Sequence, residues 1–210
     1  TLERADPGAL AVGPRAHTST RYAPGAAASR VRGVGPIEEL VLYELHVGSF
    51  HALQGPPATF AEVRERLDHL EELGINSLAI MPVHAFATGL SWGYNPTSLY
   101  AVEPSYGGPE GLTELVARAH DREMSVVVDV VYNHLDGASP LCGWLPGDGC
   151  GPYFYANPPL DMTDWGPRPS YDAPAVWSWL AEHPGAWMDA FGVDGFRLDS
   201  TSNIRATDPG

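Results

Sequence analysis

An arginine and an aspartate lie two positions apart near the end of the chain, in the stretch GVDGFRLDS at 192–200. In a β-strand, positions i and i+2 point to the same face, so Arg197 and Asp199 would lie side by side. A cation beside a carboxylate lowers the pKa of the carboxyl group and fixes its orientation. The pair is therefore suited either to an oriented, ionised carboxylate that does chemistry or to a structural salt bridge.

The elements that position this pair are predicted to be alternating strands and helices. The predicted strands are 40–50, 75–83, 125–134 and 195–199, and the predicted helices are 59–74, 109–124 and 173–192. The order β-α-β-α-β-α-β predicts parallel strands with right-handed crossovers. Two architectures fit this order: an open doubly wound sheet and part of a (β/α)8 barrel.

Two of the predicted helices carry local signals. In 59–74, Thr59 and Glu62 have the spacing of a capping box, and Gly74 ends an apolar stripe. The members of this stripe are Phe60, Val63, Leu67, Leu70 and Leu73. The segment 173–192 contains Pro184, which removes a hydrogen bond inside a helix, so a kink or two short helices are expected there.

Polar residues gather at the carboxyl ends of the third and fourth predicted strands. They are Asp129, Asn133, His134, Arg197 and Asp199. Both candidate architectures place their active sites at this edge. No Gly-rich phosphate loop follows the first strand, which disfavours nucleotide binding. The site is therefore expected at the carboxyl edge of the sheet.

The composition limits the kinds of partner that the protein could bind. The formal net charge of -14 argues against a nucleic-acid surface, and no apolar run is long enough for a membrane span. A cytoplasmic protein without nucleic-acid or membrane partners is expected. Cys142 and Cys150 could form a disulfide or stay as free thiols. A zinc site is not expected, because no further Cys and no nearby His completes a set of four ligands.

Three motifs resemble one family. DVVYNH (129–134) and GFRLDS (195–200) are similar to the first and second signature regions of the α-amylase family of glycoside hydrolases and transglycosylases. WGYNPTSLYAVEPSYG (92–107) is similar to the substrate-facing loop after the second barrel strand of that family. The resemblance covers about residues 38–206. It implies that 37–210 form the N-terminal half of a (β/α)8 TIM barrel, strands 1 to 4. Residues 1–36 would be a linker or the tail of an N-terminal β-sandwich domain.

The resemblance also implies catalytic roles. Asp199 matches the nucleophile that attacks the anomeric carbon and forms a covalent glycosyl-enzyme. Arg197 matches the arginine that holds this carboxylate ionised and oriented. Asn133 matches a calcium ligand of some family members. One ligand does not make a site for an ion that takes 6–8 oxygens, so neither a metal nor another cofactor is expected.

Four further residues match substrate-binding positions. Asp129 and His134 match residues that bind sugar hydroxyls next to the cleaved bond, as acceptor and donor. Tyr94 matches an aromatic platform on which a sugar ring stacks. Trp92 either joins that platform or packs the loop. The implied substrate is an α-glucan or a maltooligosaccharide.

The chain also departs from the family pattern. The family barrel has eight strands and a general-acid glutamate at the end of the fifth, whereas no Glu follows Asp199 here. The chain is therefore expected to be truncated after the fourth barrel strand, with open edges through which it could self-associate. STSNIR follows Asp199, and YELHVGSF, WGY and YGGPEG resemble glucan branching enzymes and maltooligosyltrehalose trehalohydrolases. The alternative is an inactive remnant or a carbohydrate-binding module without the acid/base Glu.

Overall fold

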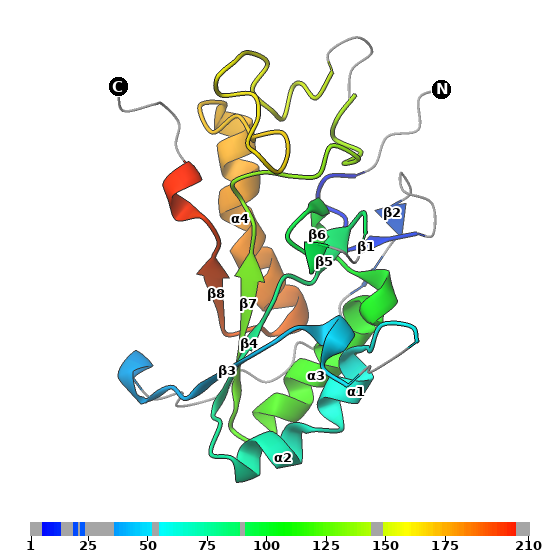
Figure 1. Ribbon diagram of the computed structural model, residues 1–210, viewed down its shortest axis with the longest axis vertical. Helices are drawn as coiled ribbons and strands as arrows, with labels where there is room; N and C mark the ends of the chain where they lie inside the picture. Colours follow the sequence, from blue (N-terminus) through cyan, green and yellow to red (C-terminus); the bar gives the residue numbers. More distant parts are fainter. Residues whose placement is uncertain are drawn as a thin grey trace.

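A parallel sheet of four strands forms the centre of the protein (Figure 1). The structure is a computed structural model that describes residues 6–13, 19–20, 22–23, 36–51, 55–88, 91–143 and 149–204. The strands are β3 (Leu42–Leu45), β4 (Ser77–Ile80), β7 (Ser125–Val130) and β8 (Gly195–Leu198), in the spatial order β3-β4-β7-β8. Each pairs in parallel with its neighbour, as the βα alternation predicts.

The strands are shorter than the apolar runs that predict them. The first run, 40–50, keeps only β3 and then turns into the short helix η2 (Val47–Ser49). The third run ends its ladder at Val130, and the chain leaves the sheet through Asn133 and His134. The apolar character continues past these strand ends because the residues that follow are buried in the loops above the sheet.

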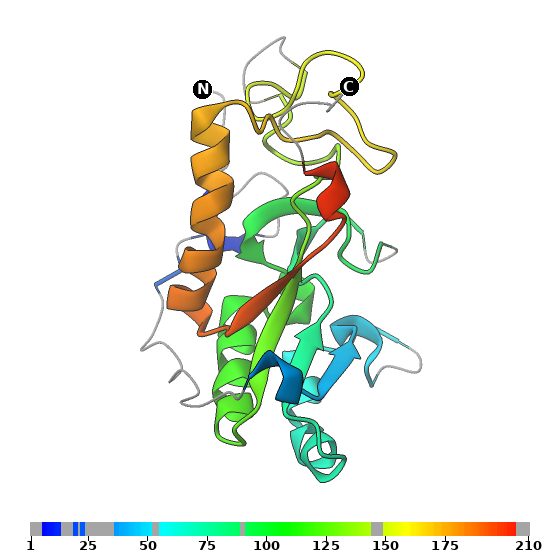
Figure 2. The same cartoon turned by 90° about the vertical axis from the view of Figure 1, so that its left-hand side faces the viewer.

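Helices pack against the sheet, and the described parts of the long segment between β7 and α4 lie over its carboxyl edge (Figure 1). The helices are α1 (Phe60–Arg64), α2 (Leu67–Glu72), α3 (Gly108–His120) and α4 (Pro174–Phe191), with the short helices η1 (Ile37–Glu39), η4 (Pro104–Tyr106) and η5 (Thr201–Asn203). Figure 2 shows α4 running beside the sheet on the side where α3 lies.

The predicted helix 59–74 is two helices in the structure. Its capping box is present: the Thr59 hydroxyl accepts from the backbone N–H of Ala61, and the Glu62 carboxylate accepts from the N–H of Thr59 at 2.7 Å. At Arg66 the backbone leaves the helical region (φ -108°, ψ 2°), which separates α1 from α2. The first four stripe residues are buried, but the inclusion of Leu73 is wrong, because it lies exposed where the chain leaves α2.

The Pro184 interruption does not divide its helix. Helix α4 is one element of 18 residues with Pro184 inside it. Leu180, His183 and Trp187 are buried on one face, on both sides of the proline. Packing of this face outweighs the hydrogen bond that proline cannot make, so of the two expected outcomes the pair of short helices is wrong, and the kink stays a prediction.

A hairpin after β4 was not expected from the sequence. Strand β5 (His84–Phe86) pairs in antiparallel fashion with β6 (Pro96–Val102). Strand β6 lies in the stretch 92–107, which resembles a substrate-facing loop. Near the N-terminus, β1 (Ala11–Val12) pairs with β2 (Ser19–Thr20). The Val102 N–H donates to the Leu10 carbonyl, and the Trp179 indole donates to the Pro7 carbonyl, so the described part of 1–36 contacts the sheet domain. The assignment of 1–36 as a linker or a domain tail stays a prediction.

Two histidines are buried in the core between the hairpin and α4. His84 Nε2 and His183 Nε2 lie 3.3 Å apart, and the Tyr132 hydroxyl lies 2.6 Å from His183 Nδ1. Trp187 packs against both imidazoles, with ring centroids 4.5 and 5.3 Å away. Burial lowers the pKa of His183 to about 3 and that of His84 well below its usual value. Both rings are therefore neutral at pH 7.

The edges and the loops complete the picture. Val41 and Leu42, at the β3 edge, are each 50% exposed. Self-association through such edges stays a prediction.

Cys142 and Cys150, for which the sequence leaves a disulfide and free thiols open, are joined by a disulfide in the structure. Within the described residues, no helix has the length and apolar character needed to cross a bilayer.

Candidate active site

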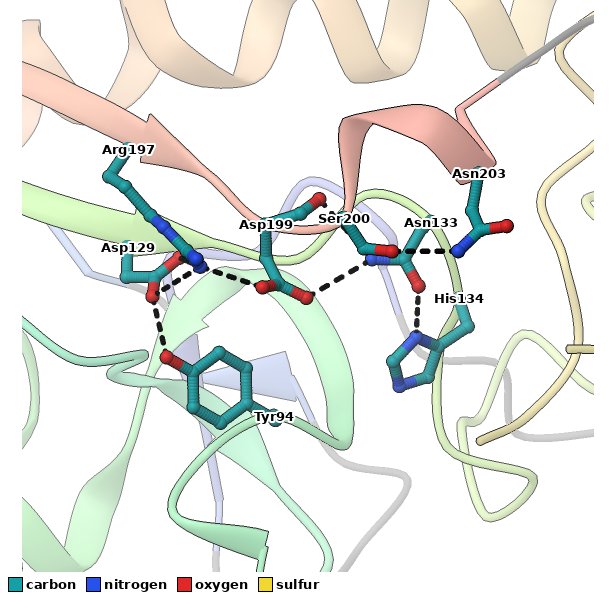
Figure 3. Close-up of polar contacts among 8 residues, drawn as sticks. All are labelled: Tyr94, Asp129, Asn133, His134, Arg197, Asp199, Ser200 and Asn203. Atoms are coloured by element: carbon teal, nitrogen blue, oxygen red, sulfur yellow. Dashed lines mark hydrogen bonds and ion pairs between the residues drawn. The ribbon is translucent and has the colours of Figure 1, made fainter. Parts of the chain in front are cut away.

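The sheet register brings the two predicted catalytic side chains to Asp129. Asp129 of β7 lies opposite Arg197 of β8, and Asp199 follows directly after β8 (Figure 3). Arg197 Nη1 donates to Asp129 Oδ1 and Oδ2 at 3.1 and 2.9 Å, and to Asp199 Oδ1 at 2.6 Å. One guanidinium nitrogen is therefore shared by two carboxylates at the carboxyl edge of the sheet.

The two carboxylates differ in their surroundings. The Asp129 side chain is 6% exposed and that of Asp199 is 23% exposed. Burial raises the pKa of Asp129, while the hydrogen bonds from Tyr94 and Arg197 act in the opposite direction. The same carboxylates raise the pKa of Arg197, which stays cationic. Asp199 is thus the more accessible of the two carboxylates, and the more buried Asp129 accepts from the arginine on both of its oxygens; its role in binding sugar hydroxyls stays a prediction.

Tyr94 contacts the site through its hydroxyl, which donates to Asp129 Oδ2 at 2.7 Å (Figure 3). Burial and the Asp129 carboxylate both raise the pKa of Tyr94. A tight turn places the residue: a Cβ on Gly93 would lie 2.2 Å from the Pro82 carbonyl oxygen, so only glycine lets the loop approach this closely. Trp92, on the same turn, is 60% exposed. The stacking roles of Tyr94 and Trp92 stay predictions.

Asn133 and His134 lie just beyond β7 and are both buried. Asn133 Nδ2 donates to the carbonyl oxygen and to Oδ2 of Asp199, both at 3.3 Å, and Asn133 Oδ1 lies 2.5 Å from His134 Nδ1. Burial lowers the pKa of His134, and its Nε2 has no hydrogen-bond partner among the described residues. An unpaired buried ring nitrogen beside Asp199 can accept or donate one hydrogen bond to a ligand.

Trp165 is a site residue that the sequence interpretation missed. The ring centroids of Trp165 and His134 lie 5.7 Å apart, and Trp165 is 53% exposed to solvent. Its loop is held close: Asn95 Nδ2 donates to the Trp165 carbonyl at 2.9 Å, and a Cβ on Gly166 would lie 2.0 Å from the Leu135 carbonyl oxygen. The indole therefore forms an exposed apolar face beside the polar site, which suits a sugar ring.

The described residues offer little to a metal ion. They contain no group of three or more His, Cys, Asp and Glu side chains placed to hold one. Asn133, the residue that matches a calcium ligand, has its amide oxygen at hydrogen-bond distance from His134. The site is built from two carboxylates, a guanidinium, an amide and an imidazole, a set that can bind hydroxyls and present one oriented carboxylate.

Comparison with known proteins gives consistent matches. Residues 54–139 match the family described as Alpha amylase, catalytic domain. The malto-oligosyltrehalose trehalohydrolase of Saccharolobus solfataricus is 38% identical over 175 residues, which are 82% of this chain and 29% of that protein. The 1,4-alpha-glucan branching enzyme GlgB of Picrophilus torridus is 32% identical over 168 residues, which are 79% of this chain and 24% of that enzyme.

A solved structure shows the same arrangement of elements. The crystal structure of a Salmonella typhimurium protein assigned to the α-amylases superposes with a TM-score of 0.81 at 29% identity, over 98% of this chain and 34% of that chain. The expected α/β fold with a parallel sheet, as in part of a TIM barrel, is therefore confirmed. The chain spans less than a third of the length of these curated relatives.

Proposed function

We propose, because this chain is a relative of the α-amylase family, that it forms the nucleophile-bearing part of a barrel that hydrolyses or transfers α-glucosidic bonds. Asp199 is the nucleophile of a retaining mechanism, and Arg197 keeps it ionised and oriented. The substrate is an α-glucan or a maltooligosaccharide. A cytoplasmic location stays a prediction.

One observation carries this proposal. Arg197 Nη1 lies 2.6 Å from the accessible Asp199 carboxylate and is fixed from behind by buried Asp129. A charge-assisted bond of this kind holds Oδ1, while Oδ2, which accepts a bond from Asn133 at 3.3 Å, keeps a lone pair that can attack. The family resemblance gives Asp129 the role of binding sugar hydroxyls, and since its oxygens already accept from Arg197 and Tyr94, we do not assign proton transfer to it.

The flanking side chains support a sugar ligand. Trp92 and Trp165 expose aromatic faces, and His134 Nε2 is a buried polar atom with no hydrogen-bond partner in the part of the chain that the structure describes. Sugar rings combine apolar faces with hydroxyl edges, so exposed indoles beside unpaired polar atoms match their chemistry.

A retaining glycosidase needs a second carboxyl group, as an acid, about 5 Å from the nucleophile. Among the described residues, Arg197 bonds only to Asp129 and Asp199. Asp199 is the nucleophile and Asp129 accepts from both Arg197 and Tyr94, so we infer that a carboxyl group other than these two is the general acid. The exposed indoles of Trp92 and Trp165 also suit a second candidate function, a carbohydrate-binding module that does not turn over.

The experiment measures reducing-sugar release, trehalose release from maltooligosyltrehalose and branch formation. We expect the 210-residue chain alone to bind maltooligosaccharides without turnover, and a polypeptide that adds the remaining barrel strands to be active. In the active polypeptide, Asp199→Asn should abolish turnover, since its amide cannot serve as the nucleophile. Asp172→Asn is the matched control, because Asp172 is exposed and bonds to Tyr155.

The outcomes separate the two functions. Turnover that survives Asp199→Asn would refute the catalytic proposal. Binding without turnover in both polypeptides would establish the carbohydrate-binding module. Release of trehalose and formation of branches distinguish the two chemistries named for the relatives.

A further inference from the structure

We infer that Asn133 is a positioning residue that orients the nucleophile Asp199 and the imidazole of His134 at the same time. The roles of Asp199 and His134 rest on the proposed function, but the geometry that connects them through Asn133 does not. The amide lies between the two side chains, with hydrogen-bond distances on both of its ends (Figure 3).

The acceptors on Asp199 fix which way the amide points. The carbonyl oxygen and the carboxylate Oδ2 of Asp199 both lie 3.3 Å from one end of the Asn133 amide. Both are acceptors only, so this end must be the NH2 group. The opposite end is then the amide oxygen, and it lies 2.5 Å from His134 Nδ1.

An amide oxygen cannot donate, so His134 must donate from Nδ1. The orientation of Asn133, which Asp199 determines, therefore decides where the proton of the imidazole is held. Burial lowers the pKa of His134, while the Tyr94 backbone and the carboxylates of Asp199 and Asp136 act in the opposite direction. The proton is on Nδ1 in the neutral ring and in the charged one alike, so the inference does not depend on the charge.

The location of Asn133 suits this function. It is fully buried, three residues after the end of β7, and Asp199 follows the end of β8. The amide thus connects the exits of two neighbouring strands above the Asp129–Arg197 pair. A side chain that cannot reorient without losing bonds on both ends holds the nucleophile and the hydroxyl-binding imidazole at a fixed spacing.

Two substitutions separate the two bonds. Asn133→Asp keeps an acceptor for His134 Nδ1 but removes the donor to Asp199 and adds a like charge beside it. Asn133→Leu removes both bonds at similar volume. Asn76→Leu is the matched control: Asn76 also bonds at both ends, to the Val41 N–H at 2.7 Å and the Glu39 carbonyl at 3.0 Å, at the opposite end of the sheet.

The first measurement needs no activity. Nitrogen-15 NMR of the imidazoles in the 210-residue chain, with His134 assigned from a His134→Gln spectrum, should show a protonated Nδ1 in the native protein, in Asn133→Asp and in Asn76→Leu. In Asn133→Leu the proton should move from Nδ1 to Nε2, because leucine offers no acceptor to Nδ1. An unprotonated Nδ1 in the native protein, or an unchanged Nδ1 in Asn133→Leu, would overturn the inference.

The second measurement is turnover in the active polypeptide. We expect kcat to fall about 10- to 100-fold in both Asn133 variants with KM changed less than threefold, because a misplaced nucleophile affects the chemical step. Equal kcat in Asn133→Asp and native protein would overturn the link to Asp199. If Asp199→Asn leaves turnover intact, the proposed function fails while the NMR result on His134 still stands or falls on its own.

Discussion

Acid should unfold this protein partly through His183. The ring is fully buried, and its pKa of about 3 lies below the 6.5 of an unperturbed histidine. Between these two values the unfolded chain binds a proton that the folded chain does not, so stability rises with pH. The stabilisation is complete above about pH 6.5 and is lost progressively as the pH falls toward 3.

The size of the effect follows from this difference in pKa. Integrated from neutral pH, the loss due to His183 is about 2 kcal/mol at pH 5 and approaches about 5 kcal/mol near pH 3. His84, 3.3 Å away and also lowered in pKa, acts in the same direction. Against a typical total stability of about 5–15 kcal/mol, such a loss is large.

The assay is equilibrium unfolding in urea at pH 7.5, 6 and 5. His183→Gln should be less stable at pH 7.5, because the contacts with Tyr132 and Trp187 are disturbed. Its loss of unfolding free energy between pH 7.5 and 5 should nevertheless be smaller than that of the native protein by about 2 kcal/mol. His69→Gln, at an exposed position of α2, is the matched control for replacing a histidine by glutamine. Identical pH dependence in His183→Gln and native protein would refute the reasoning.

Three further outcomes are expected. Tyr94→Phe removes a donor that lowers the pKa of Asp129, so that pKa should rise, as carbon-13 NMR titration of the carboxyl would show; an unchanged or lower value contradicts the assignment. Gly93→Ala places a Cβ 2.2 Å from the Pro82 carbonyl oxygen and should lower the midpoint of thermal unfolding by several degrees, whereas a midpoint within 1 °C would show that the loop can move. Thr59→Ala removes the cap of α1 and should cost about 1 kcal/mol in urea unfolding, and a cost below about 0.3 kcal/mol would argue against the capping box.

The sequence predicts the sheet and the convergence of charge well. The strands can be recognised from the local pattern of residues alone. Strand β7, for example, is an apolar run of strand length with polar residues following it. Asp129 and Arg197 meet because parallel register aligns the carboxyl ends of neighbouring strands. The resemblance to the α-amylase family, first drawn from three motifs, is confirmed by the relatives and the superposed structure.

The rest depends on contacts that no local pattern encodes. The hairpin formed by β5 and β6 is absent from the prediction because its two strands pair through irregular register, with few alternating positions. Trp165 reaches the site only because Gly166 lets its loop approach Leu135. The roles given to the site residues remain predictions, and so does the boundary at residue 36.

The pairing of Asp129 with Arg197 also has a consequence for how the chain reaches its fold. The two residues are 68 positions apart, and Asp129 is buried. A slip of β8 by one residue would place Phe196 or Leu198 opposite Asp129 and leave its buried carboxylate with the Tyr94 hydroxyl but without a cation, which destabilises that alignment. The observed register of β8 is therefore more stable than a register shifted by one residue. The pair that supports the proposed nucleophile thus also favours one alignment of β8 in the sheet.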